Sequence, residues 1–173
     1  IALSLVGSEM CIRDRWQGGE KHAPIGTSFN SLTNYSESIG KDYVRVVSCN
    51  TTGLSRTLYP LLNEYGIDNV QAVMVRRSGD PKDSDRGPIN SIEPVLNVPS
   101  HHGPDVQTVI SNLNIQTMAV KVPTTIMHVH CVIAELDSEP EVSKVLEMWE
   151  ATPRVNLIEG CLLYTSDAAD EER

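Results

Sequence analysis

Hydrophobic positions in this chain recur with two different periods, and the switch between them predicts its secondary structure. Apolar β-branched runs, or alternation with a period of two, predict strands over residues 43–47, 70–75, 115–122 and 126–136. Apolar residues three and four positions apart predict helices over residues 51–65 and 104–113. A third helix is expected between Ser138 and Pro153, and residues 155–158 begin another strand.

Details of the pattern assign faces and ends to these elements. Alternate residues from Ile115 share one strand face, and His128 and His130 point the same way in the last long strand. Ser138 and Glu141 form a capping-box pattern at the start of the third helix. Strands and helices joined by proline-bearing connections predict an α+β domain, with a mainly antiparallel or mixed sheet and helices on one face.

The two ends of the chain look foreign to the rest. Residues 10–14 can be encoded by DNA whose reverse complement, in another frame, encodes part of residues 161–166. This DNA resembles a transposase end used in sequencing-library preparation, so we expect residues 1–15 and 161–173 to be adapter-derived and not native. The competing interpretation, a secretory hydrophobic segment at the N-terminus, is short and lacks a basic start. One domain is then expected over residues 16–160.

Composition narrows the class of protein. The net charge is −9, and leaving out the three positive and six negative charges of the tails makes it −6, which argues against a nucleic-acid surface. Of the four cysteines only Cys49 and Cys131 then remain, as expected in the reducing cytoplasm rather than in a disulfide framework. No apolar run approaches the length of a membrane span.

Cys49 is the strongest candidate for chemistry. It lies between a predicted strand and a predicted helix, where unpaired N–H groups and the positive end of the helix dipole stabilise a thiolate. This placement suits a covalent nucleophile. A buried cysteine in a tight turn is the alternative, and position alone makes the two about equally probable.

Other polar groups are expected to gather with Cys49. They are Arg76 and Arg77 at a strand end, His101 and His102 before a helix, and the strand pair His128 and His130. Each has an ordinary structural explanation, such as a solvated strand end or a polar strand face. Together, a thiol, several histidines and two arginines suggest covalent chemistry on an anionic substrate.

Six ordered motifs carry a resemblance to a known family. They are QGGEKH (17–22), SCNTTGL (48–54), VRR (75–77), GPIN (87–90), PSHHGPD (99–105) and VPTTIMH (122–128). Their order and spacing resemble the archaeal type of phosphorylating glyceraldehyde-3-phosphate dehydrogenase, over residues 16–159. The resemblance implies the incomplete catalytic domain of a two-domain, NAD- or NADP-dependent enzyme. The dinucleotide-binding half would precede Trp16, because the chain has no Gly-x-Gly-x-x-Gly turn after a strand.

The resemblance also implies roles for individual residues. Cys49 would be the nucleophile and His128 the base. Substrate-contacting positions match Ser48, Cys49, Asn50, His101, His102 and Gly103. Positions that contact the cofactor match Gly19 and Arg77. The substrates would be glyceraldehyde 3-phosphate and inorganic phosphate, and the full-length protein would be a cytoplasmic homotetramer of glycolysis or gluconeogenesis. We expect the fragment to be inactive alone.

Two other hypotheses remain at this point. The first is a cysteine hydrolase or acyl transferase that uses Cys49 and His128 without a nicotinamide. The second is a metal-binding module built from His128, His130, Cys131 and the His101–His102 pair. Cys131 follows His130 directly and so points to the opposite strand face, which makes a shared metal difficult. We therefore expect no metal site.

Overall fold

The computed structural model describes residues 16–18, 27–78, 87–124 and 126–158. The expected adapter-derived tails, residues 1–15 and 161–173, lie outside this part, as does Gly19. The chain divides into two compact units, one up to Glu139 and one from Pro140. The first unit contains both sheets and the candidate site.

A four-stranded mixed sheet is the main scaffold of the first unit. Its order is β5 (Glu93–Pro94), β6 (Ile115–Val122), β4 (Asn69–Arg77) and β7 (Val129–Glu135). β4 and β6 are parallel, whereas β7 pairs antiparallel with β4 and β5 pairs antiparallel with β6. The predicted α+β class with a mixed sheet is therefore confirmed.

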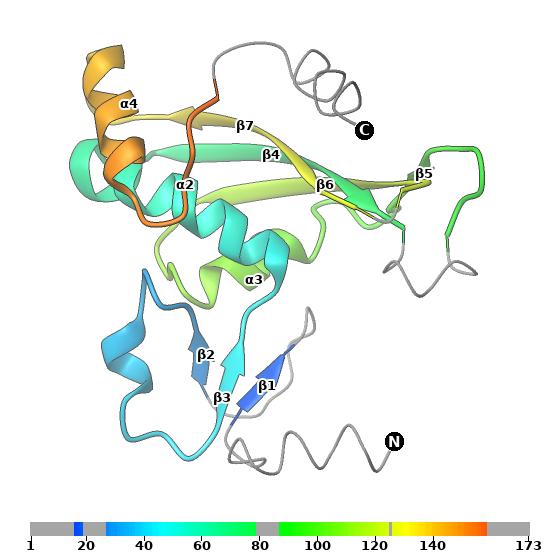
Figure 1. Cartoon of the computed structure of the whole chain (residues 1–173), viewed down its shortest axis with the longest axis horizontal. Helices are drawn as coiled ribbons and strands as arrows, with labels where there is room; N and C mark the ends of the chain where they lie inside the picture. The colour runs from blue at the N-terminus through cyan, green and yellow to red at the C-terminus, as the bar shows by residue number, and fades with distance from the viewer. Residues whose placement is uncertain (1–15, 19–26, 79–86, 125, 159–173) are drawn as a thin grey trace, which may run out of the picture. The chain divides into compact units, whose positions relative to one another are not determined.

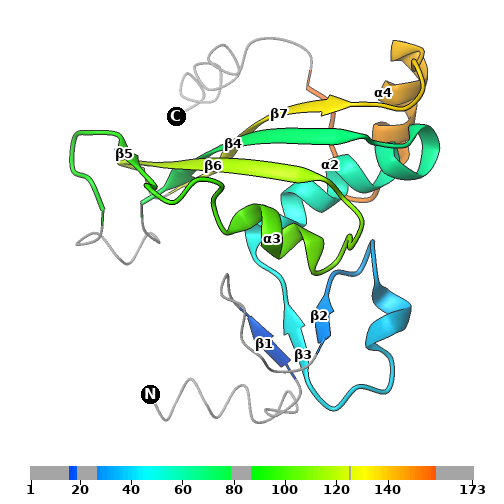
Figure 2. The same cartoon turned by 180° about the vertical axis from the view of Figure 1, so that it is seen from behind.

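One face of this sheet is covered by α2 (Cys49–Tyr65) and α3 (His102–Gln107), which lie on the same side of it in both views (Figures 1 and 2). Alternate strand residues face these helices and are almost fully buried: Val70, Ala72 and Met74 in β4, and Ile115, Thr117 and Ala119 in β6. Leu54, Leu58 and Leu61 of α2 and Val106 of α3 complete the core. The prediction that alternate residues from Ile115 share one strand face is thus confirmed, and that face is the buried one.

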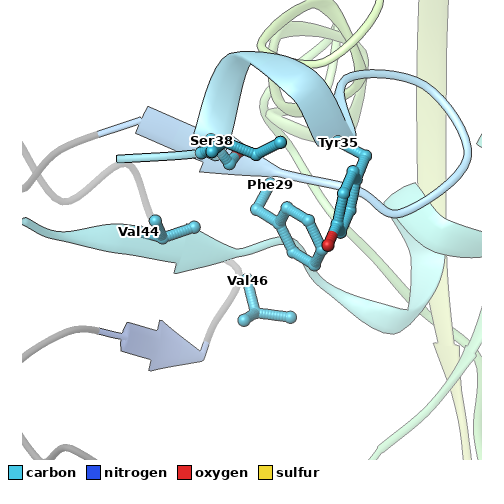
Figure 3. Close-up of a pocket in the computed structure, with 6 residues that line it drawn as sticks. Phe29, Tyr35, Ser38, Val44 and Val46 are labelled. Atoms are coloured by element: carbon cyan, nitrogen blue, oxygen red, sulfur yellow. The ribbon is translucent and has the colours of Figure 1, made fainter. Parts of the chain in front are cut away.

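A smaller, parallel sheet holds the strand that leads to Cys49. Its order is β1 (Trp16–Gly18), β3 (Val44–Val46) and β2 (Thr27–Phe29), and the short η1 helix (Tyr35–Ser38) follows β2. A shallow apolar hollow of about 310 Å³ lies between β2, η1 and β3 (Figure 3). Phe29 and Tyr35 meet there with ring centroids 6.1 Å apart. None of the predicted site residues lines this hollow.

The second unit contains α4 (Val142–Ala151), and its start corrects the predicted cap. Glu141 is the N-cap residue and makes no side-chain capping bond. The Ser138 hydroxyl instead donates to the carbonyl of Tyr65, one of the unpaired carbonyls at the end of α2. The strand expected over residues 155–158 is also wrong, because that segment joins no sheet within the described residues.

Two helix boundaries also differ from the prediction. α2 begins two residues earlier, at Cys49, because Ser48 supplies the cap. α3 is shorter than expected and ends at Gln107. Val109, Ile110 and Leu113 are nevertheless buried. Their spacing therefore indicated burial correctly, although these residues lie in turns and not in a longer helix. No helix among the described residues is long and apolar enough to cross a membrane.

Candidate active site

Cys49 is the first residue of α2 and is exposed. The preceding Ser48 has extended backbone (φ −67°, ψ 166°), and its hydroxyl accepts a hydrogen bond from the Thr51 N–H at 3.2 Å. This cap begins a helix of 17 residues directly after β3. The thiol therefore lies at the positive end of a long helix dipole and remains open to a substrate.

His128 is the group that the structure places against this thiol. Its Nε2 lies 3.4 Å from Cys49 Sγ, and its Nδ1 accepts a hydrogen bond from the Arg77 N–H at 3.2 Å. A nitrogen that accepts carries no proton, so the neutral ring holds its proton on Nε2. That proton points to the sulfur, which makes His128 a donor to a Cys49 thiolate. Met127, directly before it, has φ 72°, in the left-handed region that a side chain adopts only at a cost.

His130 contacts Asn50, the residue that follows Cys49 in the first turn of α2. It pairs across the sheet with the fully buried Met74 and so faces the helices, as does His128. Its Nε2 lies 2.9 Å from Oδ1 of Asn50, which is itself fully buried. Oδ1 can only accept, so His130 is the donor. Burial lowers the pKa of His130, and the charge of His128 acts in the same direction. His128, directly before β7, and His130, within it, thus contact the successive residues Cys49 and Asn50 of α2.

His102 is buried at the start of α3, with 1% of its surface exposed. Its Nδ1 lies 3.0 Å from the Ser100 hydroxyl, which in turn lies 2.8 Å from Thr117 Oγ1. The same threonine oxygen accepts the Gly103 N–H at 2.9 Å. These bonds fix the turn that holds Gly103. No described residue satisfies His102 Nε2.

The basic groups predicted to gather do influence one another. Burial is the largest cause that lowers the pKa of His102, to about 3. The charges of His101 and Arg76, and then of His130 and His128, lower it further. His101 also stacks on His102, with ring centroids 4.0 Å apart, and is exposed. The exposed member of this histidine pair is therefore the one open to a ligand.

His130 and Cys131, two of the metal ligands considered in the sequence analysis, point to opposite faces of the sheet, as the sequence predicted. Cys131 is exposed and pairs with Val73, on the sheet face opposite to the helices and to His130. Within the described ranges, no three His, Cys, Asp or Glu side chains are grouped so that they could hold a metal ion.

The sequence analysis did not predict the buried polar residues Arg45, Asp105 and Thr51, which bond to one another near the start of α2. Arg45 and Asp105 form an ion pair of 2.6 Å, and their side chains are only 3% and 1% exposed. Thr51 Oγ1 donates to the other oxygen of Asp105. An arginine between valines in a short apolar strand was the available signal, since a buried charge requires a partner.

Comparison with known proteins identifies the family of the chain. The family model described as the C-terminal domain of glyceraldehyde 3-phosphate dehydrogenase matches residues 48–170. The chain belongs to this dehydrogenase family. The matched region begins at Ser48 and so includes Cys49, Asn50 and His128. The resemblance that the six motifs carried is thereby confirmed.

Archaeal relatives named glyceraldehyde-3-phosphate dehydrogenase show the same kinship. The chain is 58% identical to that of Methanothermus fervidus over 151 residues, which are 87% of this chain and 44% of the relative. It is 58% identical to that of Thermococcus kodakarensis over 144 residues, 83% of this chain and 42% of the relative. The relative from Methanobacterium bryantii is 55% identical over 161 residues, 92% and 48% of the two chains. The chain thus spans less than half the length of these relatives.

Proposed function

We propose that this chain supplies the catalytic half of an enzyme that oxidises glyceraldehyde 3-phosphate, with inorganic phosphate, to 1,3-bisphosphoglycerate. The supporting observation is the 3.4 Å contact between Cys49 Sγ and His128 Nε2 at the start of α2, in a chain of this family. The relatives' names supply the substrate. We also propose residues 16–160 as the native part, and expect the chain to be inactive in the whole reaction by itself.

The first steps follow from the thiol and its neighbours. The Cys49 thiol first releases its proton to water. The resulting thiolate, stabilised by the His128 Nε2–H and the helix dipole, attacks the aldehyde carbon and forms a hemithioacetal alkoxide. The same Nε2–H then lies close enough to the sulfur to donate to the new oxygen. The alkoxide needs no base to release its hydride, since its own electron pair becomes the second bond of the thioester carbonyl.

A nicotinamide cofactor, if bound at this site, would supply the acceptor for that hydride. Arg77 is half-buried and donates its backbone N–H to His128, and we propose that it contacts the cofactor. We propose Gly19, which lies outside the described residues, as a second contact. A cationic side chain from the residue that bonds His128 suits an anionic dinucleotide, NAD or NADP. Phosphate oxygen then attacks the thioester carbon, the Cys49 thiolate leaves, and the acyl phosphate forms.

Further residues are assigned to substrate binding. We propose that Ser48, Asn50 and Gly103 line the aldehyde end and that His101, exposed beside other basic groups, contacts a phosphate. His102 completes this set, and its burial behind His101 suits a supporting contact. We propose a cytoplasmic homotetramer, in which the exposed apolar residues Val73, Met118 and Ile133 of the uncovered sheet face would lie at an interface.

The acyl half of the reaction tests the proposal without a nicotinamide. The full chain is mixed with 1,3-bisphosphoglycerate, and peptide mass spectrometry measures acylation while phosphate release is counted. We expect a stable thioester on Cys49 and release of one phosphate per chain. Cys49→Ser should abolish both, whereas Cys131→Ser, which removes the other described thiol, should change neither. Absence of acylation at Cys49 would contradict the proposal.

The hydrolase alternative predicts a different outcome in the same experiment. A hydrolase would pass the acyl group to water, so phosphate would be released continuously and no thioester would accumulate. The family match disfavours this alternative. A second measurement joins the chain to the missing half of a relative and follows reduction of the nicotinamide, which a hydrolase would not cause.

A further inference from the structure

A buried ion pair connects three elements next to the first turn of α2. Arg45 of β3 donates from Nη1 to Asp105 of α3 at 2.6 Å. Its other donors bind hydroxyl groups: Nη2 lies 2.7 Å from Ser28 Oγ and 3.0 Å from Thr108 Oγ1. The forked guanidinium therefore ties β2, β3 and α3 together through geometry that a lysine could not reproduce.

Asp105 extends this connection into α2. Its second carboxylate oxygen accepts the hydroxyl proton of Thr51, which is fully buried in the first turn of the helix. The Thr51 hydroxyl already donates its single proton to Asp105. In the 3.1 Å contact between the hydroxyls of Ser48 and Thr51, Ser48 is therefore the donor. Ser48 also accepts the Thr51 N–H. The hydroxyl that caps α2 is thus fixed in both roles by a chain of bonds that ends on Asp105.

From this network we infer that Arg45, Asp105 and Thr51 are positioning residues that fix Cys49 for attack on the substrate. The inference rests on the proposed function, since it concerns the same thiol. Cys49 lies between the N-cap residue Ser48 and Thr51 of the first helix turn, the two residues that the network holds. Asp105 also lies in α3, three residues after His102, so one carboxylate links the first turn of α2 to the element that begins with His102.

The charges explain why both members of the pair are needed. Asp105 alone would place an uncompensated negative charge near a helix start that must stabilise a thiolate. Arg45 neutralises it and leaves Asp105 as a hydrogen-bond acceptor. Displacement of a reacting group by about 1 Å can lower a rate about 100-fold, so a fixed first turn has a direct kinetic consequence.

The test compares variants of the full chain at Thr51. Thr51→Val removes the hydroxyl but keeps the shape of the side chain, whereas Thr51→Ser keeps the hydroxyl. Iodoacetamide alkylation is followed at Cys49 and at Cys131 by peptide mass spectrometry, and the ratio of the two rates is the readout. Cys131 is exposed on the opposite sheet face and serves as an internal reference.

We expect Thr51→Val to lower this ratio about tenfold and Thr51→Ser to keep it within about threefold of the original chain. Lys144→Met, which breaks an exposed ion pair, is the control and should not change the ratio. Circular dichroism checks that each variant folds, and Thr51→Ala is a second hydroxyl-free variant if the valine is not accommodated.

The outcomes separate this inference from the function on which it rests. If Cys49 in the original chain reacts no faster than Cys131, the proposed function is contradicted. If Cys49 reacts fast but the hydroxyl-free variants match the original chain, only the positioning role is contradicted. Equal losses in Thr51→Val and Thr51→Ser would also overturn it, because the hydroxyl would then not be the group responsible.

Discussion

His128 presents Nε2 to the sulfur of Cys49 at 3.4 Å while the Arg77 N–H occupies its other ring nitrogen at 3.2 Å. This arrangement makes His128 a hydrogen-bond donor rather than a proton acceptor at the sulfur. A base at this position would need a bare Nε2, which in the neutral ring requires a proton on Nδ1 and the loss of the Arg77 bond. The two roles of His128, hydrogen-bond donor or base, predict different Cys49 reactivities when an amide side chain replaces the imidazole.

We therefore expect His128→Gln to retain much of the Cys49 reactivity, because the Gln amide also donates. His128→Ala should lower the rate of Cys49 acylation by 1,3-bisphosphoglycerate about 100-fold, and His128→Gln only about tenfold. Stopped reactions analysed by peptide mass spectrometry provide the rates. Equal losses in the two variants would contradict the donor role and restore His128 as a base.

A tight contact between α2 and β7 gives a second prediction. A Cβ at Gly53 would lie 3.1 Å from Cε1 of His130, whose ring is held by Asn50. Gly→Ala inside a helix usually adds about 1 kcal/mol of stability. We expect Gly53→Ala to add none, because the new methyl group displaces the ring. Urea unfolding measures the difference.

The double variant isolates the cause. In a His130→Ala background the ring is absent, and Gly53→Ala should regain about 1 kcal/mol. Asn63→Ala, an exposed substitution in the same helix, reports helix propensity without this contact. If Gly53→Ala stabilises the original chain as much as the double background, the close packing of α2 on His130 has no energetic effect.

The sequence contained enough information for the larger elements and for the direction of their side chains. The alternation at 115–122 matches β6 because one face is buried against helices and the other is not. It also placed His128 and His130 on one face. β1, β2 and β3 have three residues each, too few to show a period. Of these, only β3 was predicted, within the strand expected over residues 43–47, whereas β1 and β2 were not.

The buried network could not be predicted, because its members are far apart in the sequence. Arg45 and Asp105 are 60 residues apart, and Cys49 and His128 are 79 apart. The hydrophobic period of an element predicts which way each side chain points, but it does not predict which other element that side chain contacts. The position of Cys49 between a strand and a helix identified the thiol, and the family motifs added the role of His128. The place of Arg45 between two valines was a signal of burial, but it did not identify Asp105 as the partner.

Acid should destabilise the fold through His102. Burial lowers its pKa from 6.5 to about 3, so the unfolded state binds this proton more readily than the folded state. Its contribution to stability is therefore complete above pH 6.5 and is lost as the pH falls from 6.5 toward 3. The lowered pKa of His130 acts in the same direction. Between pH 6.5 and about 5 we expect His102 to cost about 2 kcal/mol.

Urea unfolding at several pH values checks this sign. His102→Asn keeps an amide donor near Ser100 but cannot titrate, so its stability should fall less steeply below pH 6.5. His130 titrates in both proteins, and the difference between the two curves therefore reports His102 alone. Identical pH dependence in both proteins would show that His102 is not held neutral by burial.

Two ion pairs of the same length allow the cost of burial to be measured. Arg45–Asp105 and Lys121–Glu93 are both 2.6 Å long, but the first pair is buried and the second is partly exposed to solvent. Arg45→Met strands a buried carboxylate and should lower the free energy of unfolding by about 3–5 kcal/mol, whereas Lys121→Met should lower it by less than about 1 kcal/mol. Adding Asp105→Leu to Arg45→Met removes the stranded charge and should recover part of the loss, although Thr51 then lacks its acceptor. Equal costs for the two single variants, measured by urea unfolding, would mean that water reaches Asp105 as easily as it reaches Glu93.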